Sequence, residues 1–219
     1  MSENQQHTLP AESSAPSQTL PTHPTDAQRP LLTDEQLAHL PAQHPLRAGT
    51  AASSPMLQAL TGRPSSHRPV WFMRQAGRSL PEYRRVREGI PMLEACLTPE
   101  LAAEITVQPV RRHKVDAGIF FSDIVIPMKL AGVNVDIVPG KGPVLDRPVR
   151  TLEDVRALPE LTESALDPIR EAIAATVEML GDTPLIGFAG APFTVAAYMV
   201  EGGPSRDHLR PRTMMHADP

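Results

Sequence analysis

Two arginines in one short segment could bind a ligand that carries several carboxylates. Arg74 and Arg78 are four residues apart in the segment 73–78, MRQAGR, and Gly77 allows the chain to turn there. Arginine suits this task because its planar fork binds a carboxylate through two hydrogen bonds and never loses its charge. The alternative is an ordinary surface loop whose arginines are solvated, and spacing alone leaves both interpretations open.

A single carboxylate follows an apolar run in the segment 120–124, FFSDI. If that run is a buried strand, Asp123 lies at the mouth of the sheet and is partly removed from water. It could hold a cation there or accept hydrogen bonds from N–H groups. Ser122 and Asp123 are also residue types favoured at helix N-caps, so the alternative is a cap for the turn that follows.

A glycine-rich turn occupies residues 187–194, GFAGAPFT, and the chain then continues to Tyr198 and to the segment 201–203, EGG. Such a turn could cradle a phosphate at a helix N-terminus. It contains neither the GxGxxG pattern of dinucleotide sites nor the GK[ST] pattern of P-loops. We expect instead that its small residues let a large flat ligand approach the backbone.

Three apolar runs of strand length lie directly before these segments. They are residues 70–73, 117–121 and 185–188, and each is suited to a strand buried on both faces. Strands that alternate with helices form parallel sheets with right-handed crossovers. This leaves a (β/α)8 barrel or a doubly wound sheet, and periodicity does not decide between them.

The helices predicted around these strands begin and end at recognisable residues. Thr98 as N-cap and Pro99 at the first position start a helix over 98–113. In the helix over 166–180, Ile169, Ile173, Val177 and Leu180 are spaced by three and four, and Gly181 is placed to end it. The remaining predictions are helices at 45–60, 81–87, 126–130 and 192–200, a strand at 133–138 and a turn at 139–143.

Bulk composition excludes several classes of protein. A formal net charge of −4 gives no basic field for nucleic acid and no polybasic membrane anchor. No apolar stretch approaches the roughly 18 residues of a transmembrane helix, and the N-terminus lacks the pattern of a secretory signal. The single cysteine, Cys96, lies in an apolar stretch and is predicted to be a core thiol. These features predict a cytoplasmic protein, and the scattered histidines predict no metal site.

The N-terminal region differs from the rest of the chain. Residues 1–43 contain no aromatic residue and are rich in Pro, Ser, Thr and Gln. Such a segment cannot bury enough apolar area to offset the entropy of ordering it, so we expect a disordered tail. The folded domain is predicted to occupy residues 44–219.

Four segments in order resemble the uroporphyrinogen decarboxylase family. They are residues 69–78 (PVWFMRQAGR), 121–124 (FSDI), 138–143 (VPGKGP), and 187–192 (GFAGAP) continuing to 198–203 (YMVEGG). The resemblance extends over about residues 45–207. One short match would carry little weight, but four in the same order make coincidence a poor explanation.

The resemblance implies a fold and an activity. The fold is a (β/α)8 TIM barrel with its site at the C-terminal ends of the strands, of which this chain holds the N-terminal portion. The reaction removes carbon dioxide from the four acetate side chains of uroporphyrinogen III and gives coproporphyrinogen III, in porphyrin biosynthesis. The family uses no cofactor and no metal, and it forms homodimers.

The resemblance also implies roles for individual residues. Arg74 and Arg78 match substrate-binding arginines, and Arg74 is a candidate for delivering protons. Asp123 matches the aspartate that accepts hydrogen bonds from the pyrrole N–H groups. Tyr198 matches the tyrosine that borders the cleft and orients the substrate and Asp123. Arg87 is a weaker candidate for a further carboxylate contact, and Phe188 would line the wall.

The length of the chain departs from the family pattern. Residues 68–219 are far fewer than the roughly 250 typical of this barrel, and only three convincing barrel strands are visible. We therefore expect a truncated chain without activity of its own. Two alternatives stay open, namely a cobamide-linked methyltransferase of the same superfamily and a non-catalytic fragment. The arginines of segment 73–78 favour the decarboxylase.

Overall fold

The architecture is that of an open α/β layer, described by a computed structural model for residues 35, 38–42, 51, 53–72, 77 and 79–217. Strands β1 (Gly118–Ile119) and β4 (Leu185–Ile186) pair in parallel at its centre. The predicted tail, residues 1–43, lies outside the described residues except for 35 and 38–42. Among the described residues, no helix combines the length and apolar character needed to cross a membrane.

The first predicted strand is only partly realised. Val70 and Phe72 are 47% and 52% exposed and belong to no strand, so the prediction of a strand buried on both faces is wrong for residues 70–72. Residue 73 lies outside the described residues. The segment does run beside the start of β1, because the Asp116 N–H donates to the Val70 carbonyl at 2.8 Å. In the described part of the chain no strand pairs with the other edge of this segment.

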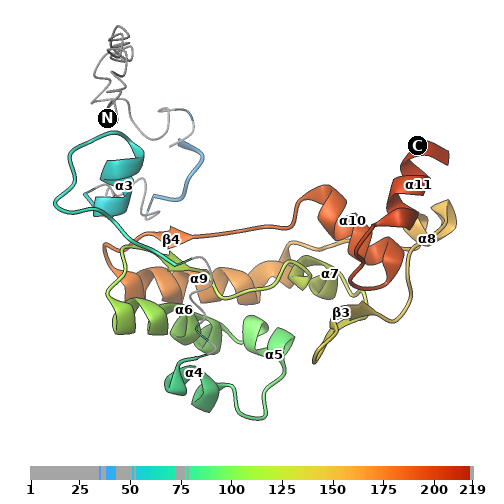
Figure 1. The fold of residues 1–219 in the computed structure, drawn as a ribbon, viewed down its shortest axis with the longest axis horizontal. Coiled ribbons are helices and arrows are strands. Elements are labelled where there is room, and N and C mark those ends of the chain that lie inside the picture. The colour runs from blue at the N-terminus through green and yellow to red at the C-terminus, as the bar shows by residue number, and fades with distance from the viewer. Residues whose placement is uncertain are drawn as a thin grey trace, which may run out of the picture.

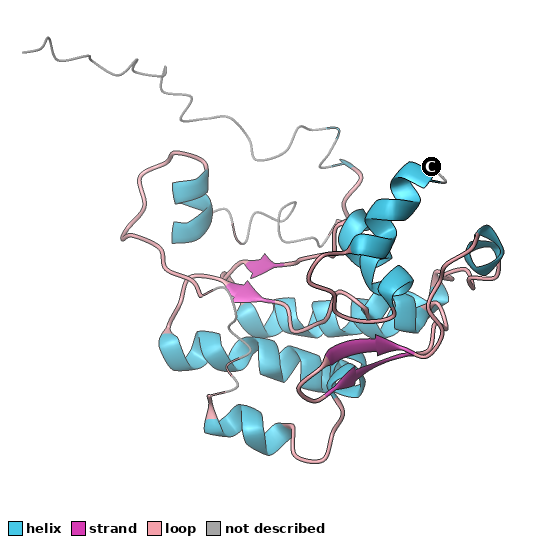
Figure 2. Ribbon diagram, turned by 45° about the vertical axis from the view of Figure 1, so that its right-hand side comes forward, coloured by secondary structure: helices cyan, strands magenta, loops and turns pink. Residues whose placement is uncertain are grey.

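The order of neighbours in this layer follows the chain. The segment at Val70 adjoins the start of β1, and β1 adjoins β4. Helices α6 (Pro99–His113) and α9 (Asp167–Leu180) both lie on one side of these strands (Figures 1 and 2). A doubly wound sheet would reverse its strand order and carry helices on both faces. The described residues show no such reversal, which agrees with a TIM-barrel-like fold, and they form an open layer rather than a closed barrel.

The two crossover helices begin and end where the sequence predicts, within a residue. Pro99 occupies the first turn of α6 after Thr98, and the backbone of Lys114 ends that helix in the left-handed conformation with φ 54°. Gly181 ends α9 with φ 58°, a value that favours a residue without a side chain. The predicted helix 45–60 is seen only as α3 (Pro55–Leu60), with residues 43–50 and 52 outside the described part.

The buried face of α9 agrees with the prediction only in part, since Leu180 is buried and Ile169 packs against the core as expected. Ala172, Thr176 and Leu180 are its buried residues, and they pack toward α6. Ile173 is 40% exposed although its spacing predicted a core position. Ala172 and Thr176 face the neighbouring helix because close helix packing needs small side chains at the contact. Ile169 and Ile173 line a groove described below.

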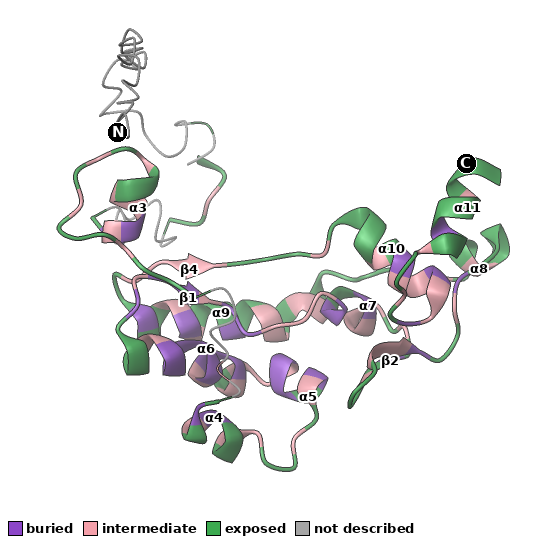
Figure 3. Ribbon diagram, viewed as in Figure 1, coloured by how far each residue is buried: buried purple, intermediate pink, exposed green. Residues whose placement is uncertain are grey.

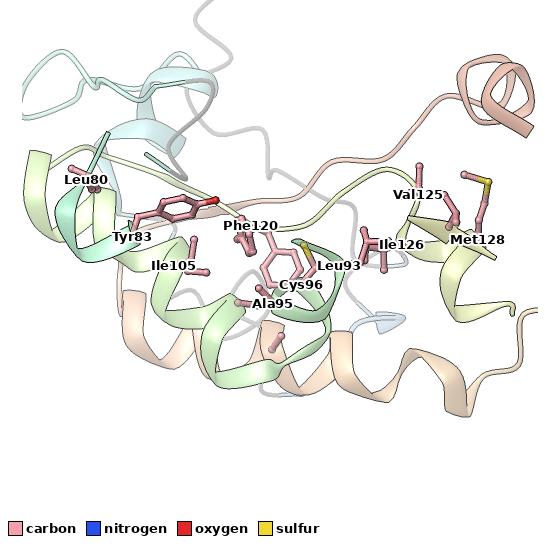
Figure 4. Packing of buried hydrophobic residues seen from close by; sticks show 14 of the residues in the cluster. Leu80, Tyr83, Leu93, Ala95, Cys96, Ile105, Phe120, Val125, Ile126 and Met128 are labelled. Carbon is pink, nitrogen blue, oxygen red and sulfur yellow. The ribbon is translucent and has the colours of Figure 1, made fainter. Parts of the chain in front are cut away.

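A second layer of short helices covers α6. Helices α4 (Pro81–Val86) and α5 (Met92–Leu97) pack on it, and α5 was not predicted. Tyr83 from α4 and Cys96 from α5 join Ile105 of α6 and the residues after β1 in the main hydrophobic core. Figure 4 shows these side chains together in one cluster.

The remaining elements extend from this core. Strands β2 (Val135–Val138) and β3 (Gly142–Leu145) form an antiparallel hairpin about the predicted turn at 139–143. The C-terminal helices present more exposed residues than the α6–α9 layer does (Figure 3). The other elements are α7 (Ile126–Leu130), α8 (Leu152–Arg156), the 3-10 turn η1 (Ser164–Leu166), α10 (Pro192–Glu201) and α11 (Leu209–Ala217).

Candidate active site

Asp123 lies in the loop after β1, as predicted, and is half-buried. Its Oδ1 accepts a hydrogen bond from the Val125 N–H at 3.0 Å, and its carbonyl accepts one from the Ile126 N–H at 3.1 Å. The capping interpretation is thus correct for one oxygen. Within the described part of the chain, no hydrogen bond reaches Oδ2. The Val125 N–H therefore orients the carboxylate through its first oxygen.

A groove of about 500 Å³ opens beside this carboxylate. Its lining comes from the loop after β1 with α7, from the stretch between Leu166 and Ile173, and from β4 with the loop that leads into α10. Asp123 and Ser122 are its only side chains with polar groups among the described residues, so the carboxylate faces an otherwise apolar wall. The apolar lining comes chiefly from Phe120, Ile124, Ile126, Leu130, Leu166, Ile169, Ile173, Leu185, Phe188 and Val195.

Phe188 shares this groove with Asp123. It lies two residues beyond β4 and is 49% exposed, so the prediction that the buried strand continues through residue 188 is wrong. The strand ends at Ile186 because the backbone then leaves β1 and runs extended toward α10, as Figure 1 shows. That departure places Phe188 in the lining of the groove.

Gly190 has a different role from the one expected for the glycine-rich turn. A Cβ at this position would lie 2.6 Å from Val195 Cγ2 and 3.2 Å from Ile124 Cβ. The side chains of Val195 and Ile124 therefore fill the space that a side chain at residue 190 would occupy. This close contact holds the loop after β4 against the loop after β1. At Gly187 nothing lies within 4 Å of an added Cβ, so only there does the backbone stay open to a ligand.

Tyr198 lies on α10, half-buried and packed against the core, but outside the lining of the groove. Val195, which does line the groove, precedes it by three residues and therefore lies on the same face of the helix. Tyr198 is one helical turn from the site. The structure shows no hydrogen bond between its hydroxyl and Asp123 among the described residues.

Arg87 lies just after α4 and also outside the groove lining. Its Nη1 donates to the Pro91 carbonyl at 2.8 Å, and its Cζ lies 6.0 Å from the centre of the Tyr83 ring. Its Nε is buried and has no hydrogen-bond partner in the described part of the chain. Arg74 and Arg78, the other predicted arginines, lie outside the described residues.

Thr106 positions the loop that carries Asp123, a role that no sequence pattern predicted. Its hydroxyl donates to the Ala102 carbonyl at 2.7 Å and accepts from the Phe121 N–H at 2.8 Å. Thr106 and Phe121 are both buried, so this bond satisfies a backbone donor that has no access to water. Asp123 follows two residues later. The contact connects the chain after β1 to α6 and so helps to position the Asp123 carboxylate.

Thr106→Val is expected to destabilise the fold by about 1–3 kcal/mol, because the Phe121 N–H would be buried without a partner. Thr176→Val is the matched control. Thr176 is equally buried and its hydroxyl donates to the Ala172 carbonyl at 2.6 Å, but within the described residues it accepts no backbone N–H. Denaturant unfolding of both variants measures the difference, and equal losses would show that the bond to Phe121 contributes nothing.

Cys96 is a buried thiol, as predicted, and it lies within electrostatic reach of two candidate site residues. Its pKa is raised from 9.0 to about 12, chiefly by burial. The Asp123 carboxylate also raises the pKa, and the Arg87 guanidinium lowers it. At neutral pH the thiol is therefore protonated and is not a nucleophile.

This raised pKa predicts a loss of stability in alkali. The unfolded thiol ionises near pH 9.0 while the folded thiol keeps its proton up to about pH 12, so raising the pH within that window favours the unfolded chain. The expected slope from this group is up to about 1.4 kcal/mol per pH unit. The free energy of unfolding can be measured between pH 8 and pH 11 for the unsubstituted chain and for Cys96→Ala. Its slope against pH should differ between the two chains by up to this amount. Parallel slopes would contradict it.

Comparison with known proteins places the chain in a family. The family model for uroporphyrinogen decarboxylase (URO-D) matches residues 51–219. A uroporphyrinogen decarboxylase of Arthrobacter sp. (strain FB24) is 75% identical over 171 residues, which are 78% of this chain and 50% of the relative. That of Saccharopolyspora erythraea is 61% identical over 168 residues, 77% of this chain and 46% of the relative. The chain belongs to the uroporphyrinogen decarboxylase family, and it spans about half the length of these curated relatives.

A solved structure supports the fold alone. A methyltransferase from Methanosarcina mazei superposes with a TM-score of 0.52 at 24% sequence identity, covering 67% of this chain and 44% of that one. This agrees with a TIM-barrel-like α/β fold. The family match and the high identity to the decarboxylases favour the decarboxylase over the methyltransferase alternative.

Proposed function

We propose that this chain supplies the N-terminal part of the active site of a uroporphyrinogen decarboxylase, which converts uroporphyrinogen III to coproporphyrinogen III. The single observation that carries the proposal is the placement of Asp123. One oxygen of its carboxylate is fixed by the Val125 N–H, and the residue lines an otherwise apolar groove. The 60–75% identity to decarboxylases covering this same half supports the assignment.

The chemistry requires a fixed negative charge near the pyrrole nitrogens. Protonation of a pyrrole carbon creates a cation, which accepts the electron pair released when the acetate group loses carbon dioxide. A carboxylate held close to the ring N–H groups stabilises that cation, in the same way that oxyanion holes stabilise the opposite charge. The apolar wall around Asp123 strengthens the interaction because it excludes water from one side of the charge.

The other predicted residues take supporting roles in this proposal. Arg74 and Arg78 bind substrate carboxylates, and Arg74 helps to deliver protons. Phe188 lines the wall, and Tyr198 borders the cleft from the next turn of α10. Arg87 stays the weaker candidate, because its guanidinium already contacts Pro91 and Tyr83.

The proposal covers the assembled enzyme as well as the site. The complete protein is expected to close the sheet into a (β/α)8 barrel, to form a homodimer and to work in the cytoplasm without a cofactor. In the described residues, no three His, Cys, Asp or Glu side chains gather in a way that could hold a metal ion.

A hybrid enzyme tests the proposal. Residues 51–219 of this chain would replace the matching part of the Arthrobacter relative, which supplies the rest of the barrel. We expect this hybrid enzyme to convert uroporphyrinogen to coproporphyrinogen at a rate comparable with that of the relative, whereas the 219-residue chain alone releases no carbon dioxide. A hybrid enzyme with native circular dichroism and no turnover would refute the proposed function.

A further inference from the structure

The loop after β1 and the loop after β4 meet through side-chain packing rather than strand pairing. Strands β1 and β4 pair over two residues each, and one further backbone hydrogen bond runs from the Phe120 N–H to the Ile186 carbonyl at 3.0 Å. Beyond that bond, in the described part of the chain, no backbone hydrogen bond joins the two loops. Direct contact between the two sides of the Asp123 groove therefore depends on packing.

This packing is centred on Gly190, just before the start of α10. That helix has Ala191 as its N-cap and Pro192 as its first residue. Gly190 is therefore the residue before the cap, and Val195 is the fourth residue of the helix. Apolar side chains at these two positions often pack together and fix the angle at which the chain enters a helix, an arrangement called a hydrophobic staple. Here the first of the two side chains is missing.

Ile124 of the other loop takes the place of that side chain. A Cβ built on Gly190 would lie 2.6 Å from Val195 Cγ2 and 3.2 Å from Ile124 Cβ, so both side chains crowd the same point. The backbone of Gly190 is not in the left-handed region, so the contact rather than a turn requires glycine here. We call Ile124, Gly190 and Val195 the Gly190 staple. All three residues are half-buried and line the groove.

The Gly190 staple adjoins three candidate site residues. Its isoleucine directly follows Asp123, and its glycine follows Phe188 by two residues. Its valine precedes Tyr198 by three residues, on the same face of α10. A shift of one loop against the other would therefore change the separation between the Asp123 carboxylate and the wall that contains Phe188.

We infer that Gly190 is a positioning residue for the decarboxylation: its bare backbone lets Ile124 and Val195 meet above it and so fixes the Asp123 carboxylate relative to the apolar wall of the groove. This inference rests on the proposed function. It assigns Gly190 no contact with substrate. The effect on the rate is expected to be large, because misplacing a reacting group by about 1 Å can cost on the order of 10²-fold.

Gly190→Ala in the hybrid enzyme should lower kcat for coproporphyrinogen formation about 10- to 100-fold, because the added methyl group overlaps Val195 Cγ2 and pushes the loops apart. KM should change less, since no contact with substrate is removed. The double variant Gly190→Ala/Val195→Ala lacks the overlapping atom. Its kcat should return most of the way to that of Val195→Ala alone, a non-additive effect typical of residues in contact.

Ala196→Gly is the matched control for a general loosening of α10. Ala196 is exposed on the same helix and lies outside the lining of the groove. Glycine weakens a helix through its backbone freedom, but kcat should stay near that of the unsubstituted hybrid enzyme. Equal losses of kcat in Ala196→Gly and Gly190→Ala would overturn the inference. A double variant no more active than Gly190→Ala would overturn it too.

Urea unfolding of the 219-residue chain measures the Gly190 staple without any turnover. Gly190→Ala should lower the urea midpoint, and Val195→Ala should lower it less in the Gly190→Ala background than in the unsubstituted chain. Equal shifts in the two backgrounds would show that the two residues do not interact, and the inference would fail.

The two measurements separate this inference from the proposed function. If the hybrid enzyme is active and Gly190→Ala has the same kcat, the inference fails and the proposed function stands. If the hybrid enzyme is folded but inactive, the proposed function is refuted, and the role of Gly190 in the reaction is refuted with it. The urea midpoints then show whether the Gly190 staple remains as a packing contact alone.

Discussion

Asp123→Asn in the hybrid enzyme is expected to lower the rate of carbon dioxide release by about 10²–10³-fold, with little change in folding. Asparagine keeps an oxygen that can accept the Val125 N–H, so the turn before α7 should be preserved. What disappears is the negative charge that stabilises the protonated pyrrole. The loss should therefore appear mainly in kcat, measured as coproporphyrinogen formed from uroporphyrinogen.

The control for this variant is Asp182→Asn, an exposed aspartate in the turn before β4. It removes the same charge from the same chain at a distance from the groove lining, and its activity should match that of the unsubstituted hybrid enzyme. Equal activity of Asp123→Asn and Asp182→Asn would show that the carboxylate beside the groove takes no part in the reaction.

Arg74→Ala is expected to have the second largest effect, and on a different quantity. A charge-assisted hydrogen bond contributes about 1.5–3 kcal/mol, so loss of the arginine should raise KM for uroporphyrinogen about 10- to 150-fold. Arg74→Lys should recover only part of this, because an ammonium group cannot bind a carboxylate through a planar fork. Any added fall in kcat would reflect the role of Arg74 in proton delivery.

Arg156→Ala serves as the matched control for Arg74. Arg156 lies exposed on α8, outside the lining of the groove. Its removal should leave KM unchanged, which separates a specific carboxylate contact from the general loss of a positive charge. The prediction for Arg74 is wrong if both substitutions change KM to the same extent.

Much of the fold could be predicted because its signals are local. Thr98 with Pro99 starts α6 and Gly181 ends α9, since capping depends on a few adjacent residues. The parallel pairing of β1 with β4 follows from the alternation of strands and helices. The strand ends were less predictable. Phe188 is apolar yet half exposed, because whether an apolar residue is covered depends on neighbours that its own segment does not specify.

The residues of the candidate site also differ in how far local sequence patterns predict them. Asp123 could be found because a carboxylate directly after an apolar run is unusual, and the structure places it at a groove that also holds Phe188. Thr106 could not be found, since it acts through a hydrogen bond to Phe121, which lies 15 residues away in the sequence. The exposure of Ile173 was missed because helical spacing gives the apolar face but not which part of it meets another element.

A crystal structure of the hybrid enzyme with coproporphyrinogen bound under reducing conditions would show directly whether Asp123 and Arg74 share one substrate. The Asp123 carboxylate should lie about 2.7–3.2 Å from pyrrole nitrogens of the macrocycle, with Arg74 bound to a carboxylate of the same molecule. A macrocycle bound elsewhere, with Arg74 and Asp123 pointing away from each other at opposite ends of the strands, would contradict it.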